Sequence, residues 1–181
     1  MNSAPITAAT RPLADINRMD AAAFAVAFGK VYEHSPWIAE RAFALRPAAG
    51  FASRAALHAA LVATVHSATM DEQIRLLCAH PELVGKEAAA GTLTADSTRE
   101  QAVAGLSALR AADVDRLRAL NQSYREQFGF PFIIAARNNT QAAIFGTLEA
   151  RLHNSRTMDL HNALAQVGEI ARLRLLDLVT E

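Results

Sequence analysis

The sequence predicts an all-α fold, a single-domain bundle of about eight helices with one short extended segment. Apolar residues recur at spacings of three and four along most of the 181 residues, which is the period of amphipathic helices. Glycine and proline, the residues that most often interrupt helices, number only 8 and 6. The length also favours one domain, since domains mostly contain roughly 100–200 residues.

Four helices are expected before residue 80. Ser35 followed by Pro36 is typical of a helix start, because proline is tolerated at the first helical position. Pro81 ends the fourth helix, because the residue before a proline is disfavoured in the α region. The expected ranges are 20–33, 35–45, a helix capped by Ser53 that runs through residue 65, and 71–79.

Four more helices are expected after a loop at 82–94. The first begins near Ser97, and the second spans 112–127 and stops at Gly129. The third begins at Thr140, and the fourth spans 158–178. Residues 130–136 are apolar but have no helix caps. This segment therefore predicts a short strand or a buried extended stretch.

Composition limits the classes of function. Residues 1–14 lack the apolar core of a signal peptide and predict a flexible arm ahead of a domain at 15–181. Basic and acidic residues balance at 18 each, which disfavours a nucleic-acid partner. No apolar run reaches the roughly 20 residues that span a bilayer, so no membrane segment and a cytoplasmic location are expected. The single cysteine, Cys78, excludes an internal disulfide and lies in an apolar run that predicts a core thiol.

His80 is a candidate for chemistry because it lies where Pro81 ends a helix. A helix C-terminus carries partial negative charge and favours imidazolium, which raises the pKa of a group that titrates near neutrality. The alternative is that His80 only caps free carbonyl groups. None of the six histidines has the spacing of a zinc site, and the sequence contains no phosphate-binding glycine loop and no nucleophile elbow. No metal site is predicted.

Three other features have both a structural and a functional interpretation. Glu100 follows Ser97 at the spacing of a capping box, so it either closes a helix start or orients His80. The backbone groups of 130–136 must pair with a strand or with a planar polar ligand. Arg174 is either a solvated residue of the last helix or a binder of an anion.

Five segments together resemble one family. They are EHSPWIAER at 33–41, AHPELVGK at 79–86, LTADSTREQ at 93–101, NQSYREQFGFPFIIAAR at 121–137 and IARLRL at 170–175. In order and spacing they are similar to the 2-oxo-4-hydroxy-4-carboxy-5-ureidoimidazoline (OHCU) decarboxylases, which complete the oxidation of urate to (S)-allantoin. Position 82 is often aspartate in that family and is Glu82 here.

The resemblance implies an all-helical homodimer that decarboxylates OHCU without a cofactor. It makes His80 the catalytic acid or base, Glu100 its partner and Arg174 the binder of the substrate carboxylate. The other implied substrate-binding residues are Pro81, Ser97, Thr98, Arg99, Gln101, Phe132, Ile133, Ile134, Ala135 and Ala136. Two other functions compete with this one: hydrolysis of a related ureide, and a non-catalytic helical module that binds a partner.

Overall fold

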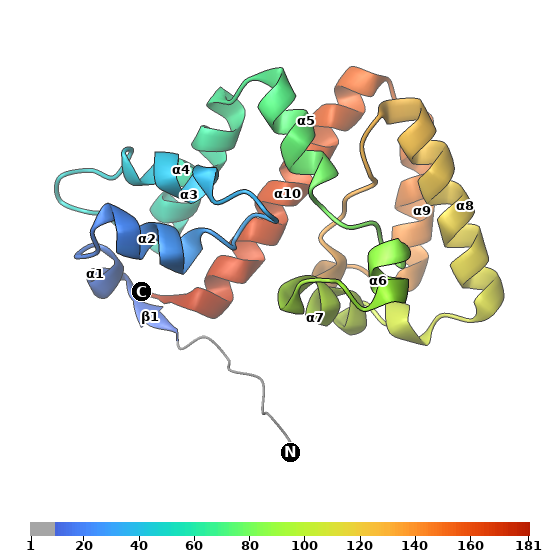
Figure 1. Ribbon diagram of the computed structural model, residues 1–181, viewed down its shortest axis with the longest axis horizontal. Coiled ribbons are helices and arrows are strands. Elements are labelled where there is room, and N and C mark those ends of the chain that lie inside the picture. The colour runs from blue at the N-terminus through green and yellow to red at the C-terminus, as the bar shows by residue number, and fades with distance from the viewer. Residues whose placement is uncertain (1–9) are drawn as a thin grey trace, which may run out of the picture. The chain divides into compact units, whose positions relative to one another are not determined.

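A computed structural model describes residues 10–181 and confirms a mostly helical chain (Figure 1). Within these residues, ten α-helices, two short 3-10 helices and one pair of two-residue strands follow the order β1 Arg11–Pro12, α1 Leu13–Ile16, α2 Ala21–Phe28, α3 Trp37–Phe43, α4 Arg54–Ser67, α5 Met70–Cys78, α6 Lys86–Ala90, α7 Ala95–Val103, η1 Leu106–Ala108, α8 Ala111–Phe128, η2 Ala136–Asn138, α9 Gln141–Arg151, α10 Arg156–Leu178 and β2 Val179–Thr180. None of the helices in 10–181 combines the length and the apolar character needed to cross a membrane.

The internal contacts of the chain gather into two compact units, where the sequence analysis expects one bundle. The first unit comprises Met1–Ala68 and Ala171–Glu181, and the second comprises Thr69–Ile170. The boundary therefore falls within α10, whose residues belong to both units.

The first unit is built on α2, α3 and α4, which pack in sequence. Side chains cap two of these helices: Asp20 accepts from the Ala23 N–H at 2.8 Å, and Ser53 accepts from the Ala56 N–H at 3.0 Å. The apolar interior of the unit includes an aromatic cluster of Phe24, Phe28, Phe43 and Phe51.

The two ends of the described chain meet in the first unit (Figure 1). Arg11 and Pro12 pair in parallel with Val179 and Thr180. Residues 1–9 of the expected arm lie outside the described residues. The side chain of Leu13, next to this pairing, is buried.

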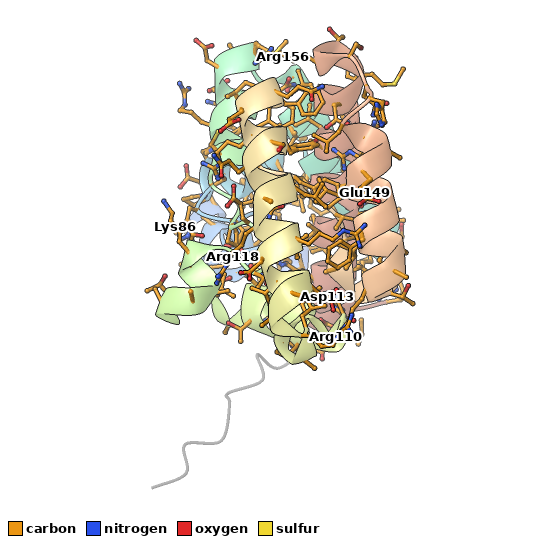
Figure 2. All side chains as sticks on the ribbon, turned by 90° about the vertical axis from the view of Figure 1, so that its right-hand side faces the viewer. Lys86, Arg110, Asp113, Arg118, Glu149 and Arg156 are labelled. Atoms are coloured by element: carbon orange, nitrogen blue, oxygen red, sulfur yellow. The ribbon has the colours of Figure 1, made fainter. Side chains whose placement is uncertain are left out.

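The second unit begins with α5, which Thr69 and Glu72 open as a reciprocal capping box. Figure 2 shows α8 and α9 side by side, with Arg110 and Asp113 at the start of α8 and Arg156 beside its other end. Gly129 ends α8 with a φ of 81°, a left-handed conformation that a glycine adopts at no steric cost.

Two expectations for the second unit are wrong in detail. The loop expected at 82–94 contains the short helix α6, Lys86–Ala90. Cys78 is exposed and not in the core, because Leu76 and Leu77 occupy the buried face of α5 at that level.

Candidate active site

His80 follows the end of α5 and is buried, with 6% of its surface exposed. Its Nδ1 lies 2.9 Å from the carbonyl oxygen of Leu76 in the last turn of the helix, which also accepts from the Ala79 N–H at 3.3 Å. Since a carbonyl only accepts, Nδ1 carries the proton in the neutral ring, and the buried Nε2 is the nitrogen that can take up another. His80 thus caps the helix and also presents a basic nitrogen, so the two interpretations are compatible.

The helix α7 places three of the predicted residues on one buried face. Ser97, Glu100 and Gln101 are all buried, as expected for positions i, i+3 and i+4 of a helix. Thr98 and Arg99 are exposed: Thr98 donates to the carbonyl of Thr94 at 2.9 Å, and Arg99 pairs with Asp96 at 3.0 Å.

The capping box predicted for Ser97 and Glu100 is wrong. The cap of α7 is Thr94, whose hydroxyl accepts from the Ser97 N–H at 3.2 Å. Thr94 lies three residues earlier and offers the same side-chain oxygen, so the helix starts there and Ser97 falls inside it. Glu100 is therefore a buried carboxyl within a helix and does not close its first turn.

Amide side chains on both sides hold the loop that follows His80. The Nδ2 of Asn121 donates to the carbonyl of Leu83 at 2.9 Å, and the Oε1 of Gln101 accepts from the Val84 N–H at 3.0 Å. Val84 has a φ of 53°, which is strained for a β-branched residue and is typical of functional loops. The Oδ1 of Asn121 is buried and has no hydrogen-bond partner among residues 10–181.

The segment 130–136 is buried and extended, and it pairs with no strand of the described chain. Side chains bind its backbone: Arg151 donates to the carbonyl of Ile133 at 2.8 Å, and Gln166 accepts from the Ala135 N–H at 2.9 Å. Asn139 donates to the carbonyl of Ala135 at 2.9 Å. The backbone of Ile134, between them, makes no hydrogen bond to any residue from 10 to 181.

Arg151 and Asp159 form a buried ion pair behind this segment. The guanidinium binds both carboxylate oxygens of Asp159, at 2.9 and 3.0 Å, and its Nη2 donates to the Tyr124 hydroxyl at 2.9 Å. Burial lowers the pKa of Arg151 to about 10. It raises the pKa of Asp159 to about 6, and the hydrogen bond with Asn162 opposes that rise.

Arg174 belongs to the first unit, whereas the other predicted residues belong to the second. It is buried and forms an ion pair with Glu33, with an Nη2 to Oε1 distance of 2.9 Å. Its Nη1 also contacts the carbonyl of Val31 at 3.3 Å. Glu33, the partner of Arg174, was not among the predicted site residues, although it opens the first of the five quoted motifs.

Within the second unit, the predicted residues converge from three elements. The helix α7 contacts η2, which directly follows the extended segment. The same helix binds the loop after His80 through Gln101 and Val84. The second unit thus contains the buried imidazole of His80, the buried carboxyl of Glu100 and a segment in which the N–H and C=O of Ile134 make no hydrogen bond to residues 10–181. Among residues 10–181, no group of three or more His, Cys, Asp or Glu side chains is placed to hold a metal ion.

Three relatives are similar to this chain over about nine tenths of its length. The OHCU decarboxylase of Haloferax volcanii is 40% identical over 163 residues, which cover 90% of this chain and 93% of that protein. The enzyme of the same name from Mus musculus is 39% identical over 164 residues, which cover 91% and 90%. The uric acid degradation bifunctional protein PucL of Bacillus subtilis is 40% identical over 167 residues, and the match spans only 32% of that longer protein.

Two crystal structures resemble the fold of this protein. That of (S)-allantoin synthase has a TM-score of 0.73 at 31% identity and matches 93% of this chain and 54% of its own. That of OHCU decarboxylase in the presence of (S)-allantoin has a TM-score of 0.64 and matches 81% and 92%; at 22% identity it supports the fold alone. A family model described as OHCU decarboxylase matches residues 17–176. With that match and relatives about 40% identical, the chain belongs to the OHCU decarboxylase family.

Proposed function

We propose that the protein decarboxylates OHCU to (S)-allantoin, without a cofactor, and protonates the product carbon on one face. The observation that carries the proposal is the state of His80, a buried imidazole whose Nδ1 binds the Leu76 carbonyl and whose Nε2 is the remaining basic atom. The names of the relatives that match nearly end to end supply the substrate.

The proposed reaction needs orientation and proton transfers. The bond from the ring carbon to its carboxylate breaks, CO2 leaves, and the electron pair forms a C=C bond to the ureido-bearing carbon while the electrons of the ring C=N bond move to nitrogen, which takes up a proton. The hydroxyl of the resulting enol then loses its proton and becomes a carbonyl as the ureido-bearing carbon gains a proton on one face. Because the substrate accepts its own electrons, the protein is not required to supply an electron sink.

His80 is the residue we assign to the proton transfer. General acid–base catalysis of this kind typically contributes about 10²–10⁴-fold. Glu100 is a buried carboxyl on the helix that braces the loop after His80, and we assign it the role of holding the imidazole in its charge state.

The proposed substrate contacts are polar groups with remaining capacity. The backbone N–H and C=O of Ile134 can pair with the acceptor and donor groups of the ring and of the ureido group. The side-chain oxygen of Gln101 accepts from the Val84 N–H, and its amide nitrogen, Nε2, can donate to an acceptor on the substrate. Arg174 is proposed to bind the carboxylate as a bidentate fork.

Two further properties are proposed from the family resemblance. We expect a homodimer in the cytoplasm. Sedimentation equilibrium at micromolar protein concentrations measures the oligomeric state. A monomer at all of these concentrations would contradict the proposed homodimer.

The decisive experiment generates OHCU in situ from urate and follows circular dichroism and CO2 release. The wild-type protein should give one enantiomer of allantoin faster than the spontaneous reaction, which gives a racemate. His80→Asn should fold normally and lose about 10²-fold or more in turnover. His153→Asn, which changes an exposed histidine of the same unit, is the matched control and should be unaffected.

Each contrary outcome is informative. Racemic allantoin at the spontaneous rate would refute the proposed function. Consumption of the ureide without CO2 would indicate a hydrolase. Wild-type turnover in a well-folded His80→Asn variant would remove His80 from the chemistry while leaving the reaction intact.

A further inference from the structure

Arg151, the last residue of α9, ties the extended segment to two other helices of the second unit. Its guanidinium donates to the carbonyl of Ile133 in the segment, to the hydroxyl of Tyr124 in α8 and to the carboxylate of Asp159 in α10. The three partners come from separate parts of the sequence. One side chain therefore fixes the relative positions of three elements of this unit.

The guanidinium is almost fully committed to these bonds. Four hydrogen bonds between 2.8 and 3.0 Å use four of its five N–H donors. Its carbon also lies 4.9 Å from the ring centroid of Phe132, a cation–π distance. Such a group has little capacity left for a ligand, so a role for Arg151 in the reaction must act through the segment.

Arg151 fixes the peptide unit that joins Ile133 to Ile134. The carbonyl of Ile133, which Arg151 binds, and the N–H of Ile134 belong to this one planar unit. The carbonyl of Ile134 belongs to the next unit, whose N–H, that of Ala135, is bound by Gln166. The Ile134 N–H and C=O themselves bind nothing in residues 10–181. Buried backbone groups need partners, and fixing the other end of each peptide plane fixes the direction in which those partners must lie.

We propose that Arg151, held by Asp159, is a positioning residue that fixes the Ile133 carbonyl and thereby orients the Ile134 N–H, which lies in the same peptide plane, toward the substrate. This inference rests on the proposed function, since it takes the ureide as the ligand of that N–H.

The test compares three variants of the full chain. Arg151→Lys keeps the charge beside Asp159 but cannot bind Ile133, Tyr124 and both carboxylate oxygens together. Tyr124→Phe removes only one hydroxyl and keeps the ring. Arg156→Lys is the matched control, because Arg156 also donates to a backbone carbonyl, that of Phe128 at 3.1 Å, at the far end of α8 from Arg110 (Figure 2).

Two measurements separate positioning from general stability. The first is the split between KM and kcat for OHCU: Arg151→Lys should raise KM about tenfold and Tyr124→Phe about threefold, with kcat nearly unchanged. The second is amide hydrogen exchange at Ala135, which should accelerate in the same order while amides inside α9 keep their rates. Arg156→Lys should change neither quantity.

Several outcomes would overturn the proposal. They are an unchanged KM in folded Arg151→Lys, unchanged exchange at Ala135, or an acceleration that is equal throughout the second unit. If Arg151→Lys does not fold, Tyr124→Phe decides by the same two measurements. If the wild-type protein lacks decarboxylase activity, the proposed function fails and the positioning of substrate fails with it, whereas Ala135 exchange still reports whether Arg151 fixes the segment.

Discussion

Each of the two units buries an arginine in an ion pair with a carboxylate, and the two arginines are held differently. Arg151 in the second unit makes four hydrogen bonds of 2.8–3.0 Å, two of them to Asp159. Arg174 in the first unit binds the carboxylate of Glu33 at 2.9 Å. Its contacts with the carbonyls of Val31 and Lys30 are longer, at 3.3 and 3.5 Å.

The difference separates a structural arginine from one suited to a ligand. A guanidinium with short bonds from four of its five donors to protein atoms would lose several of them to admit a substrate. One with long carbonyl contacts exchanges weak bonds for a strong bidentate pair with a carboxylate. On this comparison Arg151 supports the proposed site and Arg174 is the better candidate for direct binding.

The largest effect that tests the comparison is on stability. Asp159→Ala leaves the Arg151 charge buried without its partner, which should cost about 3–5 kcal/mol. Glu33→Ala should cost less, about 2 kcal/mol. Removing Asp159 also takes away the partner of Asn154, whereas the carbonyls of Val31 and Lys30 stay beside the Arg174 guanidinium when Glu33 is removed. Urea denaturation of both variants measures the costs, and equal values would remove the distinction between the pairs.

A smaller effect concerns the pH dependence of the Arg151 pair. Burial raises the pKa of Asp159 from 3.8 to about 6, so the folded protein binds a proton that the unfolded chain releases between these values. The stability from this group is therefore complete below about pH 4 and is lost as the pH rises through 6. Asn154, Asn162 and Arg151 are the polar groups bound to this carboxylate.

The measurement is the unfolding free energy of the wild type minus that of Asp159→Asn. This difference should fall by on the order of 2 kcal/mol between pH 4 and pH 7. A difference that rises over the same range would mean that Arg151 holds the carboxyl ionised and that attraction within the pair exceeds the penalty of burial.

Strong periodicity made the long helices predictable from sequence. The ranges 71–79, 112–127 and 158–178 lie within two residues of α5, α8 and α10. The helix expected at 20–33 is too long, since α2 ends at Phe28 before Gly29. The helices α1 and α6 have only 4 and 5 residues, too few to repeat an apolar pattern. The pairing of β1 with β2 joins the two ends of the chain, and no local signal reports such a contact.

The candidate site was less predictable than the fold. His80 stood out locally because Pro81 ends its helix. Glu100 and the segment 130–136 also had a functional interpretation from local features, but the choice of that interpretation, and Gln101 altogether, depended on the family resemblance. Arg151 was missed because a basic residue in the last turn of a helix is ordinary. Its partners Tyr124, Ile133 and Asp159 lie 27, 18 and 8 residues away, and only folding brings them together.

The smallest effect is also the one that decides whether Arg174 binds substrate. Arg174→Lys keeps a positive charge opposite Glu33 but cannot form a planar fork with a carboxylate. We expect KM for OHCU to rise about tenfold, equivalent to about 1.4 kcal/mol of binding, while the stability changes by less than in Glu33→Ala. The control is Arg172→Lys, an exposed arginine two residues earlier on the same helix, which should leave KM unchanged. If KM rises in Arg172→Lys and not in Arg174→Lys, Arg172 is the carboxylate binder and the Arg174–Glu33 pair is as structural as that of Arg151. If neither variant changes KM, the carboxylate is bound by another group, and the long contacts of Arg174 reflect looser packing in the first unit.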